Sequence, residues 1–156
     1  MCKIMKAAII EKTGGPEVIE LKDISLEKPN EYDVTIEQKA IGLNYIDTYH
    51  RSGLYPLKLP TGLGLEGSGI ITEVGSKVKN LKAGDRVAYA AIPLGSYSTH
   101  RNFPASKLVK IPDGVDFEVA ATLMTKGLTT YYLLHQTYKV NSGDTILFHA
   151  AAGGVG

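Results

Sequence analysis

The glycine-rich end of the chain is the segment whose residue types and spacing could do chemistry. An apolar run, residues 145–150, leads into Ala151, Ala152, Gly153, Gly154, Val155 and Gly156. A strand that enters such a turn is typical of a dinucleotide-binding βαβ unit, because the backbone N–H groups can approach a pyrophosphate. A tight turn that binds nothing is the alternative. The helix and second strand of a complete unit do not follow within the 156 residues.

Histidine and cysteine are the residues here that could bind a transition metal. The four histidines, His50, His100, His135 and His149, do not pair at ligand spacing, which favours core or surface positions for them. Cys2 is the only cysteine, so an internal disulfide and a multi-cysteine zinc site are both excluded. The sequence therefore predicts no metal site.

Composition places the chain among globular proteins. Hydrophobic residues make up 44% of the 156 residues and charged residues 21%, which is enough apolar material for one core. The net charge of +1 argues against nucleic acid or an anionic membrane as a partner. No apolar run approaches the roughly 20 residues that cross a bilayer. The apolar stretch at the start of the chain is too short for a signal peptide. We expect a cytoplasmic protein.

The elements that must position any site are mostly short strands. Alternating or apolar runs bounded by turn residues predict strands over 6–10, 18–24, 34–40, 70–74, 86–90, 97–101 and 108–111. This series predicts an antiparallel barrel or sandwich. One short helix interrupts it, with Asn44 as its N-cap and Gly53 at its end.

After residue 114 the periodicity becomes helical. Asp113 or Asp116 can cap a helix that carries Phe117, Ala120, Ala121 and Met124 at helical spacing. A second helical run extends over 126–136, and Gly127 predicts a break between the two.

Several segments, in order, resemble the medium-chain dehydrogenase/reductase superfamily. Residues 64–69 (GLEGSG) and 74–87 (VGSKVKNLKAGDRV) are similar to signatures of its barrel domain. Residues 39–49 (KAIGLNYIDTY), 51–56 (RSGLYP), 126–134 (KGLTTYYLL) and 148–156 (FHAAAGGVG) resemble its zinc-independent quinone oxidoreductase branch.

The resemblance implies a mainly β fold with some α. It predicts a GroES-like catalytic domain over residues 1–125. It also predicts, over 126–156, a linking helix with the first strand and glycine-rich turn of an incomplete Rossmann domain. On this hypothesis the chain is an N-terminal portion that binds NADPH weakly or not at all by itself. Strand 145–150 would then be disordered, pair with another copy or promote aggregation.

The chain departs from the zinc-dependent members of the superfamily at two positions. They have a cysteine where this chain has Asn44 and a histidine where it has Leu65, and neither replacement can ligate zinc in the same way. Without a Lewis acid the substrate must already accept hydride readily. The resemblance therefore implies hydride transfer from NADPH to a quinone or an activated enone.

The resemblance also implies roles for single residues. Among the catalytic residues, Asn44 and Tyr49 would bind the substrate carbonyl or a nearby water, Asp47 would orient them, and Tyr55 would line the quinone pocket. The residues near the cofactor would be Tyr45, Lys126, Thr129, Gly153, Gly154, Val155 and Gly156. Glu66 matches an acidic family position, for which a structural hydrogen-bonding role is expected.

Each of these roles has a plainer alternative. Asp47 could be a solvated first-turn carboxylate, and Tyr49 and Tyr55 could pack as amphipathic rings. Thr129 could hydrogen-bond to the preceding helical turn, and Lys126 could be an exposed helix-start lysine.

Two function classes remain open. The first is an NADPH-dependent quinone reductase, inactive as this chain alone and a homodimer at full length. The second is a non-catalytic GroES-like barrel, either a binding module like the co-chaperonin GroES or a degenerate remnant. The segment from Asn44 to Tyr55 favours the first, because a simple binding barrel does not require it.

Overall fold

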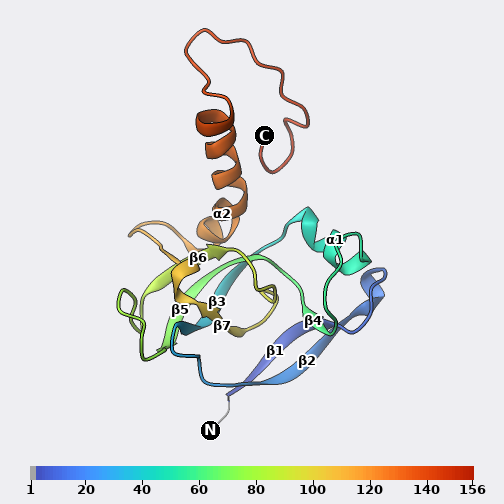
Figure 1. Cartoon of the computed structure of the whole chain (residues 1–156), viewed down its shortest axis with the longest axis vertical. Helices are drawn as coiled ribbons and strands as arrows, with labels where there is room; N and C mark the ends of the chain where they lie inside the picture. Colours follow the sequence, from blue (N-terminus) through green and yellow to red (C-terminus); the bar gives the residue numbers. More distant parts are fainter. Residues whose placement is uncertain (1–2) are drawn as a thin grey trace.

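The structure is a computed structural model and describes residues 3–156. Its strands form two antiparallel sheets. The smaller sheet contains β1 (Lys3–Ile10), β2 (Ile19–Leu26) and β4 (Thr61–Gly62), in the order β2-β1-β4. The larger contains β3 (Asp33–Gly42), β5 (Glu66–Val74), β6 (Arg86–Ala90), β7 (His100–Pro104) and β8 (Val109–Lys110), in the order β7-β3-β5-β6-β8. Figure 1 shows the sheets below α2, with α1 at their side, and the predicted mainly β fold is confirmed.

The core lies against the larger sheet. Its fully buried members alternate along the strands, as the period of two requires, and are Val34, Ile36, Ile71, Val87, Tyr89 and Phe103. A second cluster, Ile10, Val18 and Leu63, lies under the smaller sheet. A bridge between Ala7 and Ser98 connects the two sheets. Short 3₁₀ helices at Pro16–Val18 and Ala105–Lys107 complete this part.

Helix α1 (Tyr45–Ser52) forms where the sequence predicts it. Asn44, its N-cap residue, has extended backbone angles, and the Asp47 carboxylate accepts a hydrogen bond from the Asn44 backbone N–H at 3.0 Å. Gly53 ends the helix with a φ of 86°, a left-handed conformation that only glycine adopts without strain. Both ends of α1 are thus encoded locally.

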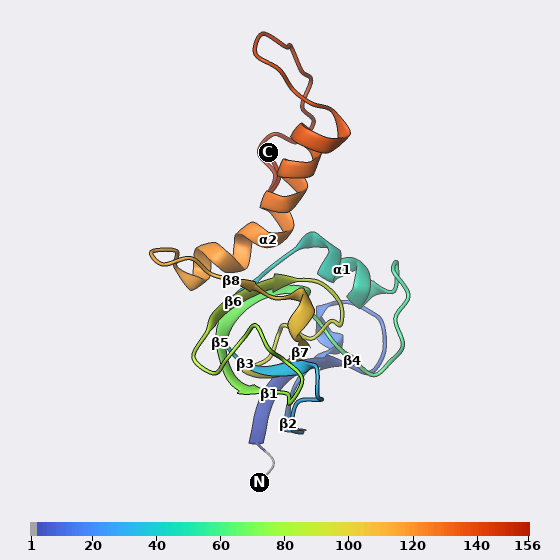
Figure 2. The same cartoon turned by 60° about the vertical axis from the view of Figure 1, so that its left-hand side comes forward.

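Helix α2 (Phe117–Tyr132) runs without interruption through Gly127 and continues into a π-helical turn, Leu133–Thr137. The predicted break at Gly127 is therefore wrong. One glycine costs a helix about 1 kcal/mol, which neighbouring turns and packing can offset. Figure 2 shows that α2 bends instead, and the Glu66 side chain accepts the N–H of Thr125 within the helix. A side chain inserted at the helical ladder is a common cause of such a bend.

Residues 138–156 form no helix or strand, so the predicted strand over 145–150 is absent from this structure. An isolated extended segment gains no ladder hydrogen bonds, and no strand of the described chain lies beside it. The segment instead loops back along α2, with Ile146, Leu147 and Phe148 exposed (Figure 1). Whether it pairs with another copy or promotes aggregation stays a prediction.

Among residues 3–156 there is no helix whose length and apolar character would let it span a bilayer.

Candidate active site

A buried carboxylate joins α1 to α2. Glu66, the first residue of β5, is 0% exposed. Its Oε2 accepts a hydrogen bond from Asn44 Nδ2 at 2.7 Å, and its Oε1 accepts one from the Thr125 N–H at 2.6 Å. Because both oxygens are used, Glu66 has the structural role that the sequence predicts, and it also holds Asn44 in place.

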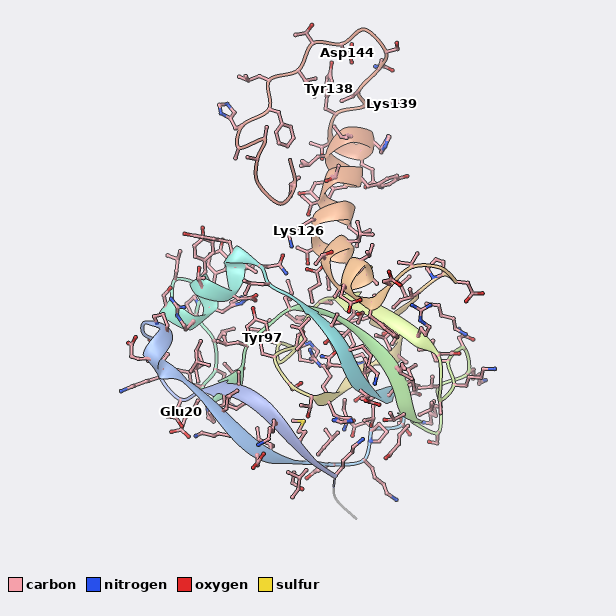
Figure 3. All side chains as sticks on the ribbon, turned by 180° about the vertical axis from the view of Figure 1, so that it is seen from behind. Glu20, Tyr97, Lys126, Tyr138, Lys139 and Asp144 are labelled. Carbon is pink, nitrogen blue, oxygen red and sulfur yellow. The ribbon has the colours of Figure 1, made fainter. Side chains whose placement is uncertain are left out.

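Lys126 extends from α2 to the other end of the same amide. Its Nζ donates to Asn44 Oδ1 at 3.3 Å and to the Leu43 carbonyl at 3.4 Å. Figure 3 shows Lys126 extending from α2 toward the side on which α1 lies. The Asn44 amide therefore lies between a carboxylate and an ammonium group. Because the carboxylate accepts and the ammonium donates, the amide NH₂ group faces Glu66 and the amide oxygen faces Lys126.

The glycine-rich segment returns to Lys126. A Cβ built on Gly154 would lie 2.7 Å from Lys126 Cε, so the Gly154 backbone lies directly against the flexible end of the Lys126 side chain. Thr130 Oγ1 also donates to the Val155 carbonyl at 3.4 Å, and the Gly153 N–H donates to the Ala150 carbonyl at 2.8 Å. A tight turn is thus placed against a lysine.

Asp47 is buried, so its alternative as a solvated carboxylate is wrong: the residue is 4% exposed. Its Oδ2 accepts hydrogen bonds from the Asn44 N–H at 3.0 Å and from the Tyr97 hydroxyl at 2.6 Å. Its Oδ1 is buried without a partner in the described residues. This arrangement agrees with an orienting role for Asp47.

Three tyrosines form an aromatic patch, defined as Tyr45, Tyr49 and Tyr55. The ring centroids of Tyr45 and Tyr49 are 5.3 Å apart, as are those of Tyr49 and Tyr55. Tyr45 is 76% exposed and Tyr55 is 47% exposed, so the patch presents its rings to solvent rather than to the core. Exposed grouped rings are typical of a surface that binds a planar ligand.

The structure brings some of the predicted residues together and not others. Asn44, Lys126, Gly154 and Val155 lie in one group, with Asp47 behind Asn44. Thr129 instead donates to the Thr125 carbonyl at 2.7 Å, which is the back-bonding alternative.

Tyr97 is the residue that sequence reasoning missed. It lies in the predicted strand 97–101, and no local motif connects it to Asp47, which is 50 positions away. The structure starts β7 later, at His100, and leaves Tyr97 in a loop that faces α1.

The stability of the chain should fall at alkaline pH partly because of Tyr97. Burial, with help from the Asp47 carboxylate, raises the pKa of Tyr97 well above the ordinary value of 10.0. Above about pH 10 the unfolded chain loses this proton while the folded chain keeps it, so rising pH favours unfolding. We expect urea midpoints to fall less between about pH 9 and pH 11 in Tyr97→Phe than in the parent chain. Tyr32→Phe, a change at an exposed ring, should retain the parent slope; equal slopes in all three proteins would contradict the assignment.

Within residues 3–156, no three histidine, aspartate or glutamate side chains lie close enough together to hold one metal ion.

A family model for the alcohol dehydrogenase GroES-like domain matches residues 30–113, more than half of the chain. The chain belongs to this family. The GroES-like match covers the strands of the larger sheet together with α1, Asn44 and Glu66.

Two curated relatives of this GroES-like chain have names that state an activity. It is 59% identical to a quinone oxidoreductase of Pseudomonas aeruginosa over 92% of this chain and 44% of that protein. It is 43% identical to a 2-haloacrylate reductase of a Burkholderia species, over 98% of this chain and 48% of the relative.

A solved structure of a relative has a similar fold. The Escherichia coli quinone oxidoreductase complexed with NADPH superposes with a TM-score of 0.94 at 50% identity, covering 96% of this chain and 46% of that one. The chain thus spans about half the length of the relatives it matches, and it corresponds to the N-terminal part of quinone oxidoreductases.

Proposed function

We propose that this chain supplies the substrate-binding part, and one edge of the cofactor site, of an NADPH-dependent quinone reductase that uses no metal. The names of the relatives support quinones as the substrate class, and the haloacrylate reductase supports activated alkenes as a second acceptor. A homodimer and a cytoplasmic location stay predictions.

The observation that carries this proposal is the juxtaposition of Lys126 with the glycine-rich segment. A lysine side chain that packs against a glycine-rich turn suits an anionic dinucleotide, because the ammonium supplies positive charge and the small residues let a phosphate approach the backbone. Lys126, Gly154 and Val155 would hold NADPH from this side. When bound, NADPH supplies the hydride.

The remaining residues position the acceptor. The aromatic patch offers exposed rings on which a planar quinone can stack. One N–H of the Asn44 amide donates to Glu66 and its oxygen accepts from Lys126, so in this proposal Asn44 fixes Lys126 and keeps its second N–H for the substrate carbonyl. Asn44 and Leu65 stand where zinc ligands would be needed, which supports hydride transfer to acceptors that require no Lewis acid.

Replacing Lys126 with methionine tests the proposal. NADPH oxidation with 1,4-benzoquinone is measured for this chain and for an extended form, in which the chain continues into the nucleotide-binding half of the Escherichia coli relative. We expect activity in the extended form, and a rise of about tenfold or more in the KM for NADPH in Lys126→Met, because charged hydrogen bonds contribute roughly 1.5–3 kcal/mol.

Lys139→Met is the matched control, since Lys139 is exposed in the loop beyond α2 and lies away from Lys126 (Figure 3). An unchanged KM for NADPH in Lys126→Met would remove Lys126 from the cofactor site. Absence of quinone reduction by the extended parent form would reject the proposed function and favour a binding barrel.

A further inference from the structure

We propose that Tyr97 is a positioning residue. It lies outside the candidate active site and orients the residues of that site through a line of hydrogen bonds that ends on α2. The Tyr97 line is defined as Tyr97, Asp47, Asn44, Glu66 and Thr125, joined by four hydrogen bonds. Its relevance to catalysis rests on the proposed function, whereas its existence as a mechanical connection does not.

Tyr97 is anchored to the sheets and not to α1. Its carbonyl accepts a hydrogen bond from the Ala8 N–H of β1 at 2.8 Å, and its own N–H donates to the Leu63 carbonyl at 3.0 Å. Its ring packs on the buried cluster that contains Ile10 and Leu63. The position of the hydroxyl is therefore set by the barrel.

Asp47 depends on that hydroxyl. One carboxylate oxygen receives both hydrogen bonds of the side chain, and the other oxygen is buried without a partner in the described residues. Removing the Tyr97 hydroxyl would leave a buried carboxylate with the Asn44 N–H alone, and under-satisfied buried carboxylates are costly.

Space for Asp47 to move already exists. Asp47 and Tyr97 line a pocket of about 90 Å³ whose other lining residues include Leu43, Leu63 and Arg51. Among the described residues, Tyr97 is the only one outside the start of α1 that hydrogen-bonds this carboxylate, so losing the hydroxyl would let the carboxylate turn into the pocket. The Asn44 N–H would then lose its acceptor.

A displacement of Asn44 would alter the hydrogen bonds of both α1 and α2. The Asn44 side chain bonds Glu66 and Lys126, and Glu66 in turn bonds Thr125 in the bend of α2. In the described residues Tyr97 has no hydrogen bond to Glu66, Lys126 or Thr125, so its hydrogen-bonded connection to them runs through Asp47 and Asn44. This separates a positioning role from simple packing of the ring, which Tyr97→Phe preserves.

The test uses NMR on this chain, with Tyr97→Phe, Asp47→Ala, the double variant and the control Tyr32→Phe. Alanine is used because asparagine would keep an oxygen that can accept both hydrogen bonds. Tyr32 is 59% exposed and packs under the Lys77 ammonium through its ring, which the change to phenylalanine keeps. In Tyr97→Phe we expect shifted Asn44 backbone and side-chain amide resonances. We also expect hydrogen exchange at the Asn44 and Thr125 amides to be faster by about tenfold, the equivalent of one lost hydrogen bond.

The double variant decides between a line and independent contacts. If the hydroxyl acts through Asp47, the double variant should show the same Asn44 and Thr125 exchange as Asp47→Ala alone. Additive effects, or unchanged exchange at both amides in Tyr97→Phe, would overturn the proposal. Should Tyr97→Phe fail to fold, the same shifts at Asn44 and Thr125 are required of Asp47→Ala, and their absence there would overturn it equally.

No measurement in this set uses NADPH or quinone. A connected response at Asn44 and Thr125, combined with an extended form that fails to reduce quinone, would uphold the Tyr97 line and reject the proposed function. The reverse combination would reject the line alone.

Discussion

Gly42→Ala should destabilise the chain by about 3 kcal/mol, the upper end of the range typical of overpacked cores. A Cβ at residue 42 would lie 2.2 Å from the Ala121 carbonyl oxygen and 2.6 Å from Glu66 Oε2. The first atom is helix backbone and the second belongs to a fully buried carboxylate, so neither can withdraw without moving α2 away from the sheet. Urea unfolding followed by far-ultraviolet circular dichroism measures the loss.

Gly127→Ala is the matched control, because it makes the same chemical change within α2. A Cβ there would meet Leu123 Cδ2 at 3.5 Å, an ordinary contact. Since alanine is the better helix former, this variant should be more stable than the parent by roughly 0.5–1 kcal/mol. Equal effects of the two substitutions would show that α2 does not press against β3 at Gly42.

Glu66→Gln should lower quinone reduction by the extended form by about 10- to 100-fold. The new amide can accept the Thr125 N–H with its oxygen, but its NH₂ group then faces the Asn44 amide. To avoid two facing donors, Asn44 must turn its oxygen toward that NH₂ group and its own NH₂ toward the Lys126 ammonium, which removes the acceptor of Lys126. An unpaired buried group costs about 1–3 kcal/mol, and about 1.4 kcal/mol corresponds to a factor of ten in rate.

Glu73→Gln is the control for this change, since Glu73 is exposed on the same strand, β5. We expect its activity to equal that of the parent. The Asn44 side-chain amide resonances of the 156-residue chain give a second measurement that needs no cofactor. Activity at the parent level in Glu66→Gln, with unshifted Asn44 amide resonances, would contradict the role given to Glu66.

Local signals predicted the elements with local causes. The alternation of Val34 and Ile36 places both in the core, and Asn44 and Gly53 bound α1 as expected. Prediction failed where a segment depends on distant partners. Residues 145–150 have the composition of a strand but pair with no other strand in this structure. Gly127 is a residue type that destabilises helices, but packing keeps α2 continuous through it.

The sequence by itself determined the mainly β pattern, the short capped helix and the group of residues around Asn44. Only the tertiary structure decided how these residues are used. Asn44 meets Glu66 across 22 positions, Tyr97 meets Asp47 across 50 and Lys126 meets Asn44 across 82. Periodicity tells which face of an element a side chain occupies, but sheet register and helix packing select the residue opposite it. For that reason the role of Tyr97 can be recognised only from the tertiary structure, in which its hydroxyl donates to Asp47.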